Sequence, residues 1–323
     1  MQKLIEISKL NVEYYKGGLV IPAVRGLDLT IGQGEILGLV GESGCGKSTV
    51  ALALMQLIPA KQGKITRGKI LFNGKNILTF SDEEVRQVRG GKIGIVFQEA
   101  FSSLNPVFTV GDQIKEAIRL HNPELNNKKA KLDAIEALRL VNIPEPEQRY
   151  NSYPHQLSGG MQQRAMIAMA LSCHPQLLIA DEPTTALDVT IQAQILDLLV
   201  KIKNELHMSI LLITHNLAVV SQIADRVAIM YAGQIVEQGP SDKLFNNPLH
   251  PYTVGLLNSV PDINNELERL AQVTGQIPDP GQLPPGCAFN PRCPDILDSC
   301  PVMFPDMIEW EEDHFVQCFK YSL

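Results

Sequence analysis

One stretch, Gly41–Thr49 with the sequence GESGCGKST, limits what this chain can fold into more than any other feature. It matches the pattern G-x-x-x-x-G-K-[ST] in full and lies between the apolar run Glu35–Val40 and the helix-like run Val50–Ile58. A strand that ends in a glycine-rich turn and opens a helix directs backbone N–H groups and the positive end of the helix dipole at one spot. The stretch therefore predicts a phosphate-binding loop within an α/β fold.

The residue types within this loop fit nucleotide phosphates. Gly41, Gly44 and Gly46 allow backbone angles and a close approach that a Cβ atom would prevent. Lys47 can reach the β and γ phosphates, and the Ser48 hydroxyl can coordinate Mg²⁺. We predict nucleotide contacts along the whole loop, from Gly41, Ser43, Gly44, Cys45, Gly46, Lys47, Ser48 and Thr49.

The bulk properties exclude several classes of protein. Lys and Arg total 28 against 35 Asp and Glu, so the formal net charge is −7, which argues against a protein that coats nucleic acid. The opening MQKLIEISKL lacks the basic flank and apolar core of a signal peptide, and no apolar run approaches about 18 residues. We therefore expect a chain that neither carries a signal peptide nor crosses a membrane by itself.

Hydrophobic periodicity predicts the secondary structure. Alternation with period two predicts antiparallel strands at Leu4–Ile7, Leu10–Tyr14 and Leu27–Ile31, and Asn73–Gly74 predicts the tight turn of a hairpin. From about residue 99 the pattern becomes helical, with helices expected at Val110–His121 and Lys128–Val141. On periodicity alone, this segment is also compatible with an ordinary helical insertion that binds nothing.

After this insertion, strands and helices alternate again. We expect helices at Met161–Cys173 and Thr190–Leu206, strands at Leu177–Ala180 and Ser209–Thr214, and a hairpin of the strands Arg226–Tyr231 and Gln234–Glu237 about Ala232–Gly233. In the second of these helices, the core face is predicted to consist of Ile191, Ile195, Leu198, Ile202 and Leu206. Alternation around a phosphate loop indicates a largely parallel α/β sheet, whereas the prolines between residues 275 and 301 argue against long regular elements there.

Two further patterns carry chemistry. The apolar strand Leu177–Ala180 runs into Asp181 and Glu182, which places one carboxylate to hold Mg²⁺ and the next to take a proton from an attacking water. Ser158 followed by two glycines at the start of a helix offers a second anion site, although out of context it is equally an ordinary helix N-cap. One chain thus has two candidate phosphate-binding helix starts.

These motifs together resemble the ATP-binding cassette (ABC) ATPases. The order and approximate spacing agree over roughly residues 4–240, and the signature LSGGMQQR is intact. The matching residues are Gly41–Thr49, Gln98, Leu157–Gln162, Leu177–Glu182, Ala186–Asp188 and His215. The resemblance implies an α/β P-loop NTPase fold: a RecA-like parallel sheet core with an antiparallel β subdomain, an inserted helical subdomain and a small Cys-rich C-terminal extension. It also implies that two cassettes pack head to tail around two ATP molecules.

The resemblance assigns roles to individual residues. Tyr14 resembles the residue that stacks on adenine, although Tyr15 is adjacent and faces the other way in a strand. Gln98 is implied to link Mg²⁺ and the attacking water to the helical subdomain. The remaining implied roles are metal support for Asp181, general base for Glu182, a D-loop contact between subunits for Asp188, the switch histidine for His215, and capping of the partner's γ-phosphate by Ser158, Gly159, Gly160 and Gln162.

The predicted domains follow from the same resemblance. Residues 1–98 form the first part of the catalytic core with the antiparallel β subdomain, and 99–165 form the helical subdomain that ends in the signature motif. Residues 166–245 complete the core, and 246–323 form the C-terminal extension.

A narrower resemblance concerns the transported substance. The segment Gln98–Phe108 and the tail, with His250–Thr253 and Pro284–Cys293, are similar to the ATPases of oligopeptide and dipeptide importers. Such subunits lie at the cytoplasmic face of the membrane and work with a second ATPase, identical or paralogous, two permease subunits and an external peptide-binding protein; no nucleic acid is expected. Alternatives are an importer for nickel or another small solute, a soluble ABC ATPase for nucleic-acid or iron–sulfur assembly work, and an iron–sulfur redox protein.

Four cysteines near the C-terminus predict a metal site. An ATPase of the reducing cytosol disfavours disulfides, so four thiolates are better read as ligands. Four thiolates can hold Zn²⁺ or a [4Fe-4S] cluster, and their spacing is diagnostic of neither. The resemblance to the importer ATPases favours the cluster, with zinc and buried free thiols as alternatives, and His314 as a spare ligand. The predicted ligands are Cys287, Cys293, Cys300 and Cys318.

Overall fold

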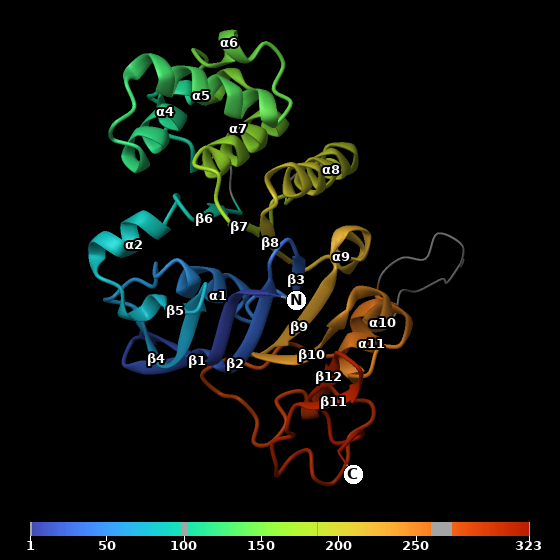
Figure 1. Ribbon diagram of the computed structural model, residues 1–323. Helices are drawn as coiled ribbons and strands as arrows, with labels where there is room; N and C mark the ends of the chain where they lie inside the picture. The colour runs from blue at the N-terminus through green and yellow to red at the C-terminus, as the bar shows by residue number, and fades with distance from the viewer. Residues whose placement is uncertain (1, 99–102, 186, 260–272, 323) are drawn as a thin grey trace. The chain divides into compact units, whose positions relative to one another are not determined.

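The structure is a computed structural model that describes residues 2–98, 103–185, 187–259 and 273–322 (Figure 1). Its internal contacts divide the chain into two compact units, Met1–Leu78 with Leu212–Leu323 (unit 1) and Thr79–Leu211 (unit 2). These two units do not correspond to the four domains predicted from the sequence. The division into four domains stays a prediction.

An antiparallel sheet of unit 1 has the strand order β2-β1-β4-β5. Its strands are β1 (Lys3–Lys16), β2 (Leu19–Gly32), β4 (Gly63–Phe72) and β5 (Lys75–Asn76). The two strands predicted before residue 15 are one strand, and the polar break between them is a bulge: Lys9 has φ 48° and the register with β2 shifts between Ile7 and Leu10. The predicted Asn73–Gly74 hairpin is confirmed, and both residues have positive φ.

A second group of strands in unit 1 carries the phosphate loop. Its order is β11-β12-β10-β9-β3, with β3 parallel to β9 and the other pairs antiparallel (Figure 1). The bounds are β3 (Ile36–Val40), β9 (Arg226–Tyr231), β10 (Gln234–Pro240), β11 (Ile308–Glu311) and β12 (His314–Val316). The helices of this unit are α1 (Lys47–Leu54), α9 (Leu217–Ile223), α10 (Ser241–Asn246) and α11 (Pro251–Asn258), and the strand β8 (Ser209–Thr214) crosses the division between the units.

Strands β11 and β12 were not predicted. Each is short and has no run of alternating apolar residues, so the sequence signal is weak. Backbone pairing of Val316 with Glu237 and of Phe315 with Gln238 adds β12 to β10. The C-terminal extension is therefore continuous with the sheet of unit 1.

Unit 2 contains the helical segment and two parallel strands. Strand β6 (Ile93–Val96) pairs with β7 (Leu177–Asp181), and every residue of β7 is buried. The helices are α2 (Asp82–Val88), α4 (Val110–His121), α5 (Asn127–Leu140), α6 (Pro146–Arg149), α7 (Gly159–Leu171) and α8 (Val189–Leu206). Helices α4, α5 and α7 pack against one another (Figure 1), which confirms the predicted helical segment.

The predicted core face of α8 is only partly buried. Ile195, Leu198 and Ile202 are buried, but Ile191 and Leu206 are half-buried, and Ile191 lies beside Gly160. Short 3-10 helices complete the described structure: η1 (Ile77–Thr79), η2 (Pro154–Gln156) and η3 (Asn290–Arg292). Among the described residues, no helix combines the length and the apolar character that crossing a membrane requires.

Candidate functional site

The phosphate loop joins the end of β3 to the start of α1, as predicted. Gly46 caps α1 with φ 110°, a conformation that suits glycine. The buried Lys47 side chain bends back over the loop, where its Nζ donates to the carbonyl oxygens of Gly41 at 2.7 Å and Glu42 at 3.0 Å. Ser43, Gly44 and Ser48 are exposed. The loop thus presents its backbone, the ammonium group of Lys47 and the hydroxyls of Ser43 and Ser48 to whatever binds there.

Close contacts with β9 and β2 fix the position of this loop. A Cβ atom on Gly41 would lie 2.2 Å from the carbonyl oxygen of Met230, and one on Gly46 would lie 2.4 Å from that of Ala23. The carbonyl oxygen of Cys45 accepts the N–H of Gly233 at 2.9 Å. The Cys45 side chain is 1% exposed and burial raises the pKa of its thiol, although nearby Lys47 lowers it. Cys45 therefore offers a nucleotide its backbone only.

Two of the predicted catalytic residues meet at the end of β7. The Glu182 carboxylate accepts hydrogen bonds from Gln98 Nε2 at 2.9 Å and from Thr185 Oγ1 at 3.0 Å. Glu182 has φ 48°, and a non-glycine residue in this region costs about 1–3 kcal/mol, a strain that concentrates at functional sites. Asp181 and Glu182 are both buried. The structure therefore holds this carboxylate in one orientation by backbone and by side chains.

The Ser158 turn begins α7, and its hydroxyl accepts the N–H of Met161 at 3.4 Å. Asp188 is the N-cap of α8, where it accepts the N–H of Ile191 at 2.9 Å. Both residues line one hollow of unit 2, together with Gly159, Gly160 and Arg164. The structure thus brings the predicted signature and D-loop residues together, while Ala186 of the predicted D-loop and residues 99–102 lie outside the described residues.

The side chains of three other predicted residues are placed as follows. Gln162 is buried, and its amide donates to the carbonyl oxygens of Pro154 and Leu157, so it holds the Ser158 turn instead of facing outward. His215 is exposed directly after β8. Tyr14 is half-buried with its ring against Gly63 of β4.

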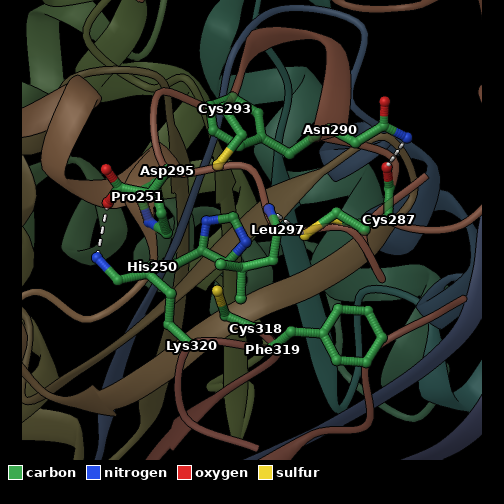
Figure 2. A pocket seen from close by; sticks show the side chains of 12 residues that line it. His250, Pro251, Cys287, Asn290, Cys293, Asp295, Leu297, Cys318, Phe319 and Lys320 are labelled. Atoms are coloured by element: carbon green, nitrogen blue, oxygen red, sulfur yellow. Dashed lines mark hydrogen bonds and ion pairs between the residues drawn. The ribbon is translucent and has the colours of Figure 1, made fainter.

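The four C-terminal cysteines line one pocket of unit 1. Figure 2 shows Cys287, Cys293 and Cys318 around it, with Asp295 and Lys320 at one side. The lining also includes Cys300, His250, Pro251, Phe289, Asn290, Leu297 and Phe319. All six cysteines of the chain are free thiols. Sequence reasoning missed His250, which is neutral because burial lowers its pKa to about 3.

The structure does not show a metal site in this pocket. Within residues 2–98, 103–185, 187–259 and 273–322, no group of three or more His, Cys, Asp or Glu side chains is gathered as a metal ion requires. The spare ligand His314 lies elsewhere, because its Nε2 pairs with Glu237 Oε1 at 2.9 Å. Neighbouring thiols affect one another's pKa. Burial is the largest cause that raises the pKa of Cys287, Cys293 and Cys318, and the neighbouring thiols raise it further. A backbone N–H at each of these sulfurs lowers the pKa in part.

Sequence reasoning also missed a contact between the phosphate loop and the C-terminal extension. Arg292 makes a two-pronged ion pair with Glu42, with N···O distances of 2.8 and 3.1 Å. The Glu42 N–H donates to the hydroxyl of Tyr252 at 3.0 Å. No local pattern indicates a pair 250 positions apart. The sequence shows only that Arg292 lies between Pro291 and Cys293.

The matching family models and the similar proteins indicate the same family. Residues 24–185 match the ABC transporter family, and residues 236–300 match the oligopeptide/dipeptide transporter C-terminal region. The oligopeptide transport ATP-binding protein AppD of Bacillus subtilis is 47% identical over 322 residues, which cover 100% of this chain and 98% of AppD. The dipeptide transport ATP-binding protein DppD of the same organism is 46% identical, over 99% of this chain and 95% of DppD.

Solved structures support the same fold. A dimeric ATP-binding cassette, MJ0796, bound to ADP and phosphate superposes with a TM-score of 0.66 at 28% identity and covers 73% of this chain and 98% of its own. The cassette cbiO1 of Clostridium perfringens gives 0.66 at 29% identity, over 76% and 92% of the two chains. The fold is that of an ABC cassette of the P-loop NTPase class, and the chain belongs to the ABC transporter family of ATPases, with the C-terminal region found in oligopeptide and dipeptide transporters.

Proposed function

We propose that this chain is the ATP-hydrolysing subunit of an importer for dipeptides and oligopeptides. The observation that carries the proposal is the presence of both family matches on one chain, with relatives named for peptide transport that are 46–47% identical over nearly its whole length. The held carboxylate of Glu182 supplies a catalytic group for the hydrolysis.

In the proposed mechanism, the loop Gly41–Thr49 binds the phosphates and Lys47 neutralises part of their charge. Glu182, oriented by Gln98 and Thr185, takes the proton of the attacking water, and exposed His215 contacts the γ-phosphate. Ser48, Gln98 and Asp181 are the residues that would hold Mg²⁺, which neutralises charge on the phosphates when bound. Tyr14 is proposed to stack on adenine.

The proposed working unit is a dimer of cassettes, with an identical or a paralogous partner. The Ser158 turn of one subunit caps the γ-phosphate on the other subunit's loop, because a helix N-terminus with unobstructed N–H groups favours an anion. Asp188, which lines the same hollow, then lies at the dimer interface. Hydrolysis removes the phosphate that joins the two halves, so ATP binding closes the dimer and hydrolysis opens it.

The proposed partners are two membrane permease subunits and, through them, an external peptide-binding protein. The subunit would lie at the cytoplasmic face of the membrane, with residues 99–165 as the helical subdomain that receives the permeases. The remaining proposed divisions are 1–98 and 166–245 for the catalytic core and 246–323 for the extension. The match of residues 236–300 favours peptides over nickel and favours a transporter over a soluble ABC ATPase.

Transport in vesicles tests this function. The ATPase is purified with its candidate permeases, reconstituted, and assayed for ATP turnover with the binding protein and either a peptide mixture or Ni²⁺. Turnover that rises only with peptide is the expected result. Stimulation by Ni²⁺ alone would replace the substrate, and failure to associate with any permease would remove the transport function.

For the four cysteines, we propose a [4Fe-4S] cluster as the occupant, with zinc as the alternative. The donor set fits a metal bound by cysteine sulfurs: four cysteines line one pocket, and a backbone N–H lies at the sulfur of Cys300, which accepts the N–H of Leu297 at 3.4 Å. The resemblance of the sequence to the importer ATPases, and not a contact in the structure, favours the cluster over zinc.

Metal analysis of anaerobically purified protein tests this assignment. The cluster requires about four iron and four sulfide per chain and a brown colour. Replacement of Cys287 and Cys293 by Ser should abolish both iron and colour. A colourless protein that contains one zinc per chain would overturn the cluster.

A further inference from the structure

The phosphate loop has an ion pair that nothing in the proposed mechanism uses. Glu42 follows the first glycine of the loop, and its carboxylate is paired with Arg292. Arg292 comes from η3 of the C-terminal extension, where Cys293 follows it directly. The two residues are 250 positions apart in one compact unit.

Every N–H of the Arg292 guanidinium has a partner. Two donate to the Glu42 carboxylate, Nε donates to the carbonyl oxygen of Thr274 at 2.9 Å, and the other two reach the carbonyl oxygen of Val273 at 3.3 Å and the Tyr231 hydroxyl at 3.5 Å. The Arg292 side chain is only 3% exposed. Lysine has three donors and no planar fork, so it cannot reproduce this arrangement.

The other side of the contact reaches Lys47 of the phosphate loop. The carbonyl oxygen of Glu42 accepts Lys47 Nζ at 3.0 Å, and the Glu42 N–H is held by Tyr252. Tyr252 packs edge-on against Tyr231, with ring centroids 4.7 Å apart, and Phe289 of the extension lies 5.2 Å from Tyr231. The backbone and the side chain of Glu42 are therefore both fixed by residues outside the loop.

Charge gives this contact a second effect. An unpaired carboxylate within the loop would repel a polyphosphate, with part of the repulsion screened by water because the Glu42 side chain is 30% exposed. Arg292 neutralises Glu42 and also determines the direction in which its side chain points. We propose that Arg292 is a positioning residue of the nucleotide site, through which the cysteine-rich extension holds the phosphate loop in its ATP-binding conformation. This inference rests on the proposed assignment of the loop to ATP phosphates.

A set of variants in the full-length protein tests the inference. Arg292→Gln should raise the KM and the Kd for ATP on the order of tenfold, within the usual range of coupling between sites, with kcat at saturating ATP unchanged. Adding Glu42→Gln to Arg292→Gln should restore part of the affinity, because the carboxylate no longer repels phosphate. Losses that simply add in the double variant would overturn the proposal.

Arg226→Gln is the matched control. Arg226 likewise pairs with a glutamate, the buried Glu35, at 2.9 Å, but this pair lies at the opposite end of β3 from the loop. Hydrogen exchange of the amides of residues 41–46 should accelerate in Arg292→Gln and not in Arg226→Gln. An equal change of ATP affinity in both variants would reduce Arg292 to a general contribution to stability and overturn its positioning role.

Two further variants keep the test decisive. If Arg292→Gln does not fold, Glu42→Gln reports on the same contact from the loop, and wild-type exchange of residues 41–46 in that variant overturns the proposal. Lys47→Ala tests the assignment of the loop to ATP phosphates, on which the inference rests. ATP binding at wild-type affinity in Lys47→Ala would show that the loop is not part of the nucleotide site.

Discussion

The carboxylate of Glu182 is the most direct point at which to test the proposed chemistry. Replacing it with glutamine keeps the size and shape of the side chain and removes its ability to take a proton. Gln98 and Thr185, which donate to it at 2.9 and 3.0 Å, remain in place. Any loss of activity then reports on the proton transfer and not on a rearranged site.

The expected magnitude follows from the role of a positioned base. Such a base contributes roughly 10²- to 10⁴-fold to a rate, or about 2.7 to 5.4 kcal/mol at 1.36 kcal/mol for each factor of ten. Thr185→Val removes a hydrogen bond that orients the carboxylate, so we expect turnover to fall about tenfold while Gln98 still holds Glu182. Adding Thr185→Val to Glu182→Gln should lower the rate little further, since the two residues act as one unit.

The assay measures ATP turnover at saturating MgATP, nucleotide affinity, and the dimer fraction by size-exclusion chromatography with ATP. Glu182→Gln should bind ATP normally and accumulate as a closed dimer. Turnover near the wild-type value would remove Glu182 from the role of base. A variant that remains monomeric with ATP while the wild-type protein dimerises would show that the substitution disturbs more than proton transfer.

Two other predictions concern single side chains. Tyr14→Ala should weaken nucleotide binding more than Tyr15→Ala, and the reverse order in a fluorescent-nucleotide titration would move the adenine contact to Tyr15, which is exposed and has Lys64 5.8 Å above its ring. Burial lowers the pKa of His250 to about 3 in the folded state, so between about pH 6.5 and pH 3 only the unfolded state binds the extra proton. The free energy of unfolding is therefore retained above about pH 6.5 and falls by up to about 1.4 kcal/mol per pH unit as the pH decreases towards 3. His250→Asn keeps a side chain that can cap α11, and its unfolding free energy should vary less over this pH range; an equal slope in denaturant titrations would contradict the reasoning.

Strongly periodic segments could be predicted from the sequence. Helix α4 and strands β8 and β9 have the predicted bounds, because each combines a clear apolar pattern with a turn or a capping residue at its ends. The bulge at Lys9 was missed, because a polar residue between two apolar runs is compatible both with a bulge inside one strand and with a break between two strands. Strand β12 was missed because its partner β10 lies more than 70 residues earlier in the chain, and pairing at that distance leaves no local signal.

For the site, motifs predicted which residues come together better than how each side chain is oriented. The hydrogen bond between Gln98 and Glu182, 84 positions apart, was not predicted, although the family resemblance assigned both residues to the attacking water. The inward turn of Gln162 was not predicted, because the hydrogen bonds that hold it are made to backbone carbonyls. The pair of Glu42 and Arg292 was also missed, since the identity of an ion-pair partner is decided by the fold and not by spacing.

The buried carboxyl group of Glu237 explains why the extension cannot be treated as a separable appendage. This side chain is 0% exposed and accepts hydrogen bonds from the N–H groups of Leu249 and His250 and from Nε2 of His314, all at 2.8–2.9 Å. All three donors come from residues beyond 246. Removing the residues beyond 246 takes away these three donors together with strand β12, which pairs with β10 at Glu237. Strand β10, which carries Glu237, pairs with β9, and the loop after β9 holds the phosphate loop at Cys45. Loss of the extension should therefore disturb the nucleotide site through the sheet as well as through Arg292.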